Sequence, residues 1–466
     1  MIVVYKKTAQ RFVYSFIVSL LFLQASAQNH VYSLQELADS AIKKYPEVMR
    51  KQALVNSATA GITDAKHEAL PFVKAHDQLN ISTANGVPGT FMPMGIILPT
   101  AGGIRADNNY QAATGNIGML YSEYELYNFG LTKARIEDAV AKQKLSVADV
   151  TKESYLLSYN IAKYYLELLR VYEQSNIELQ NMKRYQALVT VIQAETNSGL
   201  KPGVDSSQAL AELAKARINY NQRIGEAMQL EQQLFGLTGV KVSMENVDTS
   251  LNRFNQLVKD AVAINLVDTV NNPLISYYQQ RRQAEISTAN FIKKSYQPKI
   301  TLAAGLWGRA SSLDYTDTYN ALSTGLGYQR FNYLAGIAFT YNLFDGIHRR
   351  DKLAVQKYKI RASEYEVEQQ QLNLQTSLQQ SFSRQQVAER NLIALPVELK
   401  SASDTYDQKM AQYKAGLINL IDLTNAAFVL YRSQGDYVQT LTDWVQSRLD
   451  QAAVAGSLNS FIQTLK

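Results

Sequence analysis

The chain of 466 residues contains no cysteine. This absence excludes structural disulfides, cysteine-ligated zinc or iron–sulfur sites, thiol nucleophiles and a lipid-acylated cysteine. Histidine is also scarce, with four residues, and no two of them have the HExxH spacing of a zinc metalloprotease. We therefore expect neither a bound metal nor a cofactor.

Motifs of catalysis and nucleotide hydrolysis are missing as well. No GxSxG nucleophile turn and no GxxxxGK[ST] phosphate-binding loop occurs in the sequence. We expect a protein that is not an enzyme and that, if it takes part in transport, depends on the energy of a partner. The formal net charge is +6, which is too small and too dispersed to indicate nucleic-acid binding.

Long hydrophobic runs are confined to the first residues. Lys6, Lys7 and Arg11 precede an apolar run at 12–23, and small residues at 25–27 form a cleavage site, so residues 1–27 are typical of a signal peptide. Twelve residues span only about 18 Å as a helix, which is short for a membrane anchor. No later stretch is long and apolar enough to cross a bilayer as a helix. An exported protein of this kind could enter a membrane only through β-strands.

Glycine and proline are absent from one long stretch. Residues 131–198 contain neither and are bounded by Gly130 and Gly199, which predicts a single helix about 100 Å long. Its apolar residues alternate at spacings of four and three, a coiled-coil seam interrupted only by Ser175 and Glu178. The seam consists of Leu157, Ile161, Tyr164, Leu168, Val171, Met182, Tyr185, Val189 and Ile192. Residues 347–415 predict a similar helix, which Pro396 is expected to kink or break.

The sequence is an internal duplication. Prolines 25 residues apart bracket a helical stretch in both halves, as Pro46 with Pro71 and as Pro273 with Pro298. Further landmarks recur in the same order, namely Gly130 with Gly346, Gly199-Leu200 with Gly416-Leu417, Asp205 with Asp422, and Gly239 with Gly456. The expected division is a first repeat at 28–239, a linker at 240–255 and a second repeat at 256–466.

Each repeat also contains a predicted β-hairpin, at 72–127 and at 299–343. Apolar and small or polar residues alternate over 333–343, and weaker alternation at 299–309, 72–82 and 110–127 indicates the other strands. Two hairpins supply four strands, whereas the smallest membrane barrels have about eight. Closure would require other chains, and the strand count alone does not choose between two and three protomers.

These landmarks resemble those of the TolC-type outer-membrane efflux channels, and the resemblance covers essentially all of the mature chain. It rests on the signal peptide, the two repeats, the proline-bracketed helices, the turns at 126–130 and 343–346, and a Gly-Leu pair with an aspartate six residues after the glycine. It implies a mainly α fold with a β-barrel part: a long coiled-coil helical tunnel in the periplasm and four membrane strands per chain, closed as a twelve-stranded barrel in a homotrimer. The implied partners are outer-membrane lipid, a periplasmic adaptor protein of the membrane-fusion type and an inner-membrane pump, and nucleic acid is not among them.

The resemblance also implies where a gate and docking tips would lie. The tip turn at 199–203 and its counterpart in the second repeat would carry the adaptor-docking residues Gly199, Leu200, Gly416 and Leu417. A periplasmic gate or selectivity ring would consist of Asp422, Asn425, Tyr413 and Asp205. The second tip departs from the family pattern, because Asn425 and Ile418 stand where other members can carry a second aspartate and a gating arginine.

Other interpretations of these residues remain open. An aspartate in the first turn of a helix is stabilising by about 0.3–1 kcal/mol through the helix dipole, without any gate. Five tyrosines of the strand segments, Tyr121, Tyr124, Tyr127, Tyr333 and Tyr341, are expected in the membrane-interface girdle. The alternative function is a soluble periplasmic coiled-coil scaffold whose strands form a small globular β-domain.

Overall fold

The computed structural model describes residues 31–87, 103–199, 202–244 and 272–464. The expected signal peptide, Leu200, most of the expected linker and the start of the second repeat lie outside the described residues. Contacts divide the chain into two compact units. The helical unit contains residues 1–53, 147–278 and 366–466, and the strand unit contains residues 54–146 and 279–365.

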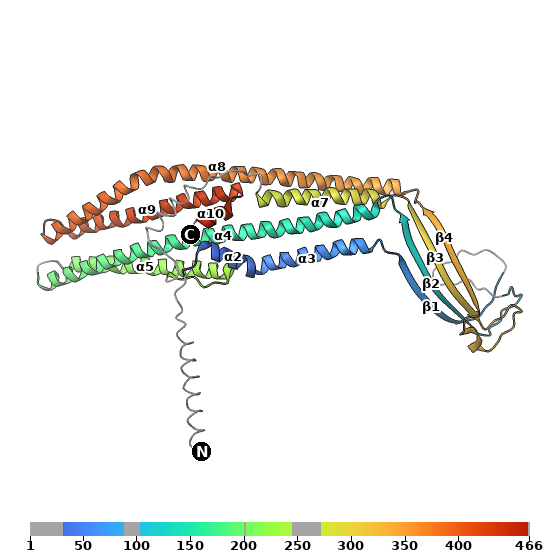
Figure 1. The fold of residues 1–466 in the computed structure, drawn as a ribbon. Helices are drawn as coiled ribbons and strands as arrows, with labels where there is room; N and C mark the ends of the chain where they lie inside the picture. The colour runs from blue at the N-terminus through green and yellow to red at the C-terminus, as the bar shows by residue number, and fades with distance from the viewer. Residues whose placement is uncertain (1–30, 88–102, 200–201, 245–271, 465–466) are drawn as a thin grey trace, which may run out of the picture. The chain divides into compact units, whose positions relative to one another are not determined.

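The element order repeats itself along the chain (Figure 1). The first half contains α2 (Leu34–Lys44), α3 (Pro46–His67), β1 (Phe72–Ser82), β2 (Ala113–Tyr127), α4 (Leu131–Asn197) and α5 (Gly203–Thr238). The second half contains α7 (Pro273–Ser295), β3 (Lys299–Ser311), the 3-10 helix η3 (Leu322–Gly325), β4 (Arg330–Thr340), α8 (Asp345–Lys414), α9 (Leu420–Ala455) and α10 (Leu458–Thr464). Both α5 and α9 have 36 residues, and each ends at a glycine with positive φ.

Local sequence explains these boundaries. Pro46 and Pro273 occupy the first position of α3 and α7, where the missing N–H of proline costs no hydrogen bond. Ser33 and Glu36 form a capping box that begins α2. α8 continues through Pro396, so this proline does not break the helix, and a kink there stays a prediction. None of the helices within the described ranges is both long and apolar enough to cross a membrane.

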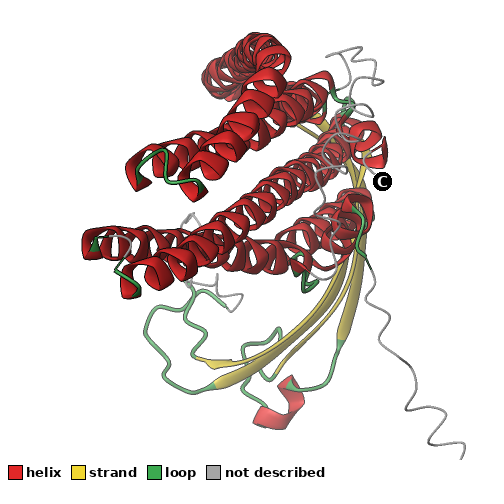
Figure 2. Ribbon diagram, turned by 90° about the vertical axis from the view of Figure 1, so that its left-hand side faces the viewer, coloured by secondary structure: helices red, strands yellow, loops and turns green. Residues whose placement is uncertain are grey.

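The strand unit contains one antiparallel sheet in the order β1-β2-β3-β4, drawn as a curved ribbon in Figure 2. β2 pairs with β1 and β3 along most of its length, and β3 pairs with β4. The helix segments of the same unit follow the same order. Glu68 on α3 pairs with Arg135 on α4, Asp138 on α4 accepts a bond from Thr288 on α7, and Glu285 on α7 accepts one from Gln356 on α8.

The fourth strand lies three residues earlier than the alternation predicts. It was expected at 333–343 and is found at Arg330–Thr340. Its start is set by the ladder with β3, in which Arg330 lies opposite Arg309. Its end is set by Asn342, whose side chain and carbonyl accept the N–H groups of Phe344 and Asp345 at 3.1 Å and turn the chain into α8. β2 likewise begins at Ala113 rather than at residue 110.

The helical unit contains two buried apolar clusters. The first cluster joins α2, α4, α5, α9 and α10 and includes Leu166, Tyr172 and Leu234. The second joins the C-terminal part of α4 to α5, α8 and α9 and includes Ile192 and Leu423. Every predicted seam residue of α4 is buried or half-buried. Because burying a leucine or isoleucine contributes about 1.5–3 kcal/mol, these clusters hold the long helices together far more than helix propensity does.

Candidate functional site

The two faces of the sheet differ in chemistry. Side chains alternate between the faces, so each row across the strands belongs to one of them. One row contains Ala75, Leu120, Leu306 and Tyr333, and the next contains His76, Met119, Trp307 and Asn332. The apolar face presents Val73, Leu79, Ile81, Leu120, Tyr124, Leu302, Leu306, Phe331, Tyr333, Ile337 and Phe339, all exposed. The polar face presents Lys74, His76, Gln78, Asn80, Glu123, Glu125, Thr301, Arg309, Arg330 and Asn332.

Such a sheet suits hydrocarbon on one side and water on the other. Tyr333 is 82% exposed and Ile337 is 71% exposed, values that a water-soluble sheet would avoid on so continuous an apolar surface. Among the described residues, β1 and β4 each pair with only one neighbouring strand, so both edges of the sheet are open. Unpaired backbone groups at such edges are costly in lipid, so the sheet is incomplete as a single copy.

A β-bulge changes which tyrosines face outward. The register between β2 and β3 shifts between Glu125 and Tyr127, and Tyr127 then lies opposite Ile300 on the apolar face. Tyr121 lies on the polar face, where its ring would lie 3.5 Å from a Cβ built at Gly305 and its hydroxyl donates to Glu123. Tyr124, Tyr127 and Tyr333 therefore occupy the surface expected for a membrane girdle, whereas the assignment of Tyr121 to it was wrong. Tyr341 lies beyond the end of β4.

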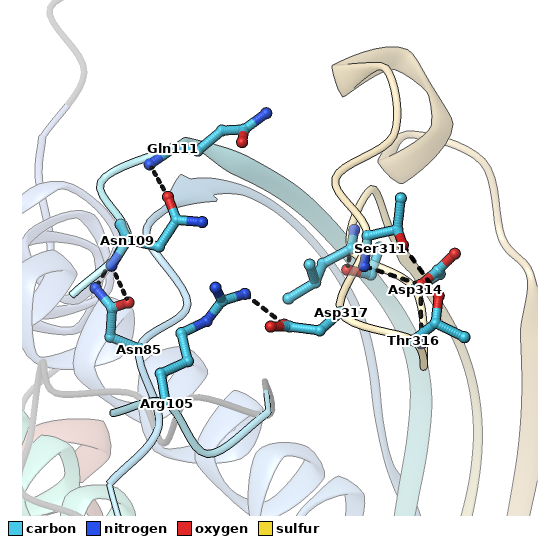
Figure 3. A network of polar contacts seen from close by, with 10 residues as sticks. Asn85, Arg105, Asn109, Gln111, Ser311, Asp314, Thr316 and Asp317 are labelled. Carbon is cyan, nitrogen blue, oxygen red and sulfur yellow. Dashed lines mark hydrogen bonds and ion pairs between the residues drawn. The ribbon is translucent and has the colours of Figure 1, made fainter. Parts of the chain in front are cut away.

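Polar contacts tie the two long loops of the sheet together (Figure 3). Arg105 of the β1–β2 loop forms an ion pair with Asp317 of the β3–β4 loop, and its guanidinium lies 5.3 Å from the ring centre of Tyr319. The Asp317 backbone has φ +68, a conformation that an aspartate tolerates better than most side chains. Asp314 fixes the turn by accepting the N–H of Thr316 at 2.9 Å. The ion pair between Arg105 and Asp317 could not be recognised in the sequence, because its partners are 212 residues apart.

The second tip is a complete helix C-cap followed by an N-cap. Gly416 has φ +71, its N–H donates to the carbonyl of Tyr413 at 3.0 Å, and the N–H of Leu417 donates to the carbonyl of Gln412 at 2.9 Å. These bonds form a Schellman motif, which ends α8. The side chain of Asn419 then accepts the N–H of Asp422 at 2.9 Å and begins α9.

The first tip shares the positive φ and the bond of its glycine N–H, but its return helix begins with a different cap. Gly199 has φ +74, and its N–H donates to the carbonyl of Thr196 at 3.0 Å. α5 begins after Pro202, which has no side-chain cap. Asp205 occupies the third position of α5, as Asp422 does in α9. Both tip glycines thus have positive φ, and both aspartates lie where a helix dipole stabilises them.

The expected gate residues do not share one surface. Asp422 and Asn425 are exposed on α9, and Leu417 is exposed at the turn. Tyr413 is only 2% exposed and packs in the second apolar cluster, apart from the exposed Asp422 and Asn425, and its place in a gate stays a prediction. Burial, with Glu195 and Asp205 nearby, raises the pKa of Tyr413 to about 12. Asp205, in the other repeat, is half-buried, and its negative charge contributes to this rise in the pKa of Tyr413.

A polar layer separates the two apolar clusters of the helical unit. It lies where Ser175 and Glu178 interrupt the coiled-coil seam of α4. Glu178 is 3% exposed; one carboxylate oxygen accepts the Tyr431 hydroxyl at 2.6 Å, and the other has no protein partner among the described residues. Burial raises the pKa of Glu178. A hollow of about 270 Å³ adjoins it, lined by Gln174, Ile177, Glu178, Arg223, Phe428, Tyr431, Arg432, Gly435, Asp436 and Gln439.

Replacing Glu178 by glutamine is expected to stabilise the helical unit at neutral pH. A carboxyl whose folded-state pKa is raised favours folding below its unfolded pKa, and this contribution is lost as the pH rises through the folded pKa. Each unit of upward shift corresponds to about 1.4 kcal/mol. Glutamine keeps an acceptor for Tyr431 without the charge. Thermal unfolding followed by circular dichroism should show a higher midpoint for Glu178→Gln at pH 7 and a shrinking difference toward about pH 4. A difference independent of pH would contradict the buried charge.

Comparison with known proteins identifies the class. The sequence matches the family described as outer membrane efflux protein over residues 37–240 and 269–457, most of its length in two segments. The chain belongs to this family. No curated protein sequence matches it.

Solved structures of similar fold agree with the family. The outer membrane protein VceC from Vibrio cholerae aligns with a TM-score of 0.71 at 15% identity, covering 91% of this chain and 96% of that one. CusC, described in terms of transmembrane channel formation, gives 0.70 at 15% identity, covering 93% and 95%. The Campylobacter jejuni CmeC outer membrane channel gives 0.70 at 13% identity, covering 94% and 90%.

These matches confirm the resemblance to TolC-type channels and the expected fold class of long helices with a small antiparallel sheet. The chain is an outer-membrane protein that extends into the periplasm, and its family is one of efflux and export ducts.

Proposed function

We propose that three copies of this chain form a passive export duct whose four-stranded sheets close into one twelve-stranded barrel. The observation that supports this proposal most strongly is the four-stranded sheet, which has an exposed apolar face, a polar face and two open edges. Pairing β4 of one copy with β1 of the next satisfies both edges. The apolar face then meets lipid, and the polar face lines a water-filled lumen.

Exposed large side chains on α8 support assembly through the helices as well. Tyr358, Tyr365 and Leu372 follow one another at intervals of seven residues and are 74%, 55% and 57% exposed. Seven-residue spacing is the repeat of a coiled-coil seam, so this stripe suits a helix of a neighbouring copy. The stripe would otherwise leave three large side chains in water.

The ends of the sheet support an orientation. One end carries the long loops joined by Arg105 and Asp317, and at the other end the strands lead directly into the helices α3, α4, α7 and α8. Membrane barrels of bacteria carry long loops on the outside and short connections toward the periplasm. In the proposed duct the loops therefore face the exterior, and the helices extend into the periplasm.

The exposed turns at Gly199 and Gly416 are the proposed docking surface for a periplasmic adaptor, which would connect the duct to an inner-membrane pump. The Schellman turn presents Leu417, which is 74% exposed. Exposed side chains of α9 continue from it, including Ile421, Asp422 and Asn425. Leu200 would be the matching residue of the first tip.

The test of assembly is the mass of the extracted protein. The mature chain purified from outer membranes in detergent should be a trimer of about 150 kDa by light scattering corrected for detergent. Its incorporation into planar bilayers should produce ion conductance. A folded, membrane-extracted monomer would contradict the barrel, and a protein found only in the soluble periplasmic fraction would favour the scaffold alternative.

The docking tips can be tested by Gly416→Val. No atom lies within 4 Å of a side chain built at this glycine, so the strain would come from φ +71 alone. A β-branched residue is strongly disfavoured in this conformation, so the turn should rearrange. Capture of the adaptor by chemical crosslinking in the native host should fall, while the amount of trimer in the outer membrane stays unchanged. Gly225→Val is the control, because this helical glycine also has open space around it but no positive φ.

A further inference from the structure

Part of the β3–β4 loop folds back over the apolar face of the sheet. We call residues 322–329 the return arm; it begins with η3, which contacts β2 and β3. These are the two central strands of the sheet. The surface beneath the arm is therefore part of the face assigned above to lipid.

The arm bonds to three polar side chains of that face. The hydroxyl of Thr114 donates to the carbonyl of Leu322, and the side-chain amide of Asn116 donates to the carbonyl of Leu326 at 2.8 Å. The hydroxyl of Tyr328 donates to Asp77 at 3.0 Å. Thr114 and Asn116 lie near the loop end of β2, and Asp77 lies at the middle of β1, on a face whose other side chains are mostly apolar.

Two paired glycines make room for the tyrosine. Gly118 lies opposite Gly308 in the ladder, and the ring of Tyr328 lies across both. A Cβ built at Gly118 would lie 2.1 Å from the Tyr328 hydroxyl oxygen, and one built at Gly308 would lie 3.0 Å from the ring. Gly325 lies equally close to Thr114, at 2.3 Å from its hydroxyl oxygen. The sheet surface is thus shaped to hold the arm.

The exposed side chains of the arm are uncharged: three are large and apolar or aromatic, and Ser323, Thr324 and Gln329 are polar. Leu322, Leu326 and Tyr328 are 44%, 52% and 43% exposed, and residues 322–329 contain no charged side chain. The arm covers polar groups of the sheet and replaces them with leucine side chains and an amphipathic tyrosine. Tyrosines of this kind concentrate at the headgroup level of membranes.

We propose that the return arm is a membrane-interface anchor that binds the outer leaflet of the outer membrane at the boundary between headgroups and acyl chains. Leu322 and Leu326 contact lipid, while the bonds to Asp77, Thr114 and Asn116 keep these polar groups out of the hydrocarbon. The anchor sets the height at which the barrel sits in the membrane. It rests on the proposed orientation of the sheet.

The absence of native cysteine allows a direct test. Single cysteines replace Leu326, Leu306 and Tyr315 in the full-length protein, a nitroxide is attached to each, and the labelled protein is reconstituted into vesicles of phosphatidylcholine and phosphatidylglycerol. Collision rates with oxygen, which partitions into lipid, and with a water-soluble nickel chelate are measured by electron paramagnetic resonance. Leu306, at mid-sheet, reports hydrocarbon, and Tyr315, 99% exposed in the same loop, reports water.

The label at position 326 is expected to collide several-fold more often with oxygen, relative to the nickel chelate, than the label at 315. If the ratio at position 326 equals that at position 315, the anchor is overturned while the barrel stays intact. A label at position 326 that is shielded from both probes also overturns the anchor, because it would indicate a protein contact instead. A label at 306 that reports water overturns the proposed orientation together with the anchor.

A second variant tests whether the position of the Tyr328 ring over Gly118 and Gly308 holds the arm on the sheet. Gly118→Leu should expel Tyr328 and bring the ratio at position 326 down to that of position 315. Gly336→Leu is the matched control, because this glycine of β4 lies on the polar face with open space around it. If Gly118→Leu does not fold, Tyr328→Ser removes the ring that lies across Gly118 and Gly308. An unchanged ratio in a folded variant would show that the arm stays in place without Tyr328 over the two glycines, and this would contradict the proposal.

Discussion

Replacing Ile337 by arginine is expected to prevent assembly of the protein in the outer membrane. Ile337 lies on the apolar face of β4, opposite Leu302, and is 71% exposed in the single chain. An arginine on the lipid face near the middle of a membrane barrel costs about 2–4 kcal/mol, and a trimer would contain three. The amount of folded trimer in the outer-membrane fraction, measured by immunoblotting of unheated samples, should fall severely.

The adjacent residue provides the control for this prediction. Ala338 lies on the polar face opposite Thr301, so Ala338→Arg places the same charge in the proposed lumen. Its trimer should assemble at close to the normal level, with altered ion selectivity in planar bilayers. Equal loss of both variants would indicate a general intolerance of β4 to arginine. Equal tolerance would show that the apolar face does not meet lipid.

The helical framework was predictable because glycines mark its ends. Six of the repeat landmarks are glycines, and five of these have positive φ: Gly130, Gly199, Gly239, Gly416 and Gly456. Residues other than glycine rarely adopt this backbone conformation. A glycine of this kind can be recognised in the sequence, because its conformation is required by the helix end next to it. Gly346, the sixth, lies within the first turn of α8, so its match with Gly130 reflects sequence spacing rather than equal geometry.

The strand assignments show where sequence reasoning fails. Counting back by twos from Tyr127 places Tyr121 on the same face, but the bulge after Glu125 reverses the alternation. A bulge leaves no clear mark in a single sequence. The start of β4 was likewise set by pairing with β3 rather than by its own alternation.

The contacts between distant segments could not be predicted at all. The bond between Tyr328 and Asp77 joins residues 251 positions apart. Tyr413 was assigned to a gate because it precedes a tip glycine, yet its side chain packs against Ile192 and Leu423 from other helices. The interruption at Glu178 was visible as a break in the seam, but its meaning depended on Tyr431, which α9 brings to it.

Asp422→Asn is expected to remove a block of the channel by multivalent cations. Asp422 and Asn425 are exposed on α9 just after the second tip, whereas Asp205 is half-buried beside Tyr413. In a trimer with α9 near its axis, Asp422 would form a ring of three carboxylates. Their mutual repulsion favours binding of a divalent or trivalent cation, and the ring of wild-type channels should therefore be blocked from the periplasmic side.

Currents in planar bilayers, with the cation added on the periplasmic side, would measure this block. Asp422→Asn should lose most of the block while the channel still conducts, because the amide keeps the shape without the charge. Asn425→Asp should strengthen the block by adding a second ring one turn further along α9. Asp205→Asn is the control and should change the block little, since that carboxylate serves its helix end. An Asp422→Asn channel with undiminished cation sensitivity would mean that Asp422 acts only as the first-turn acid that stabilises α9.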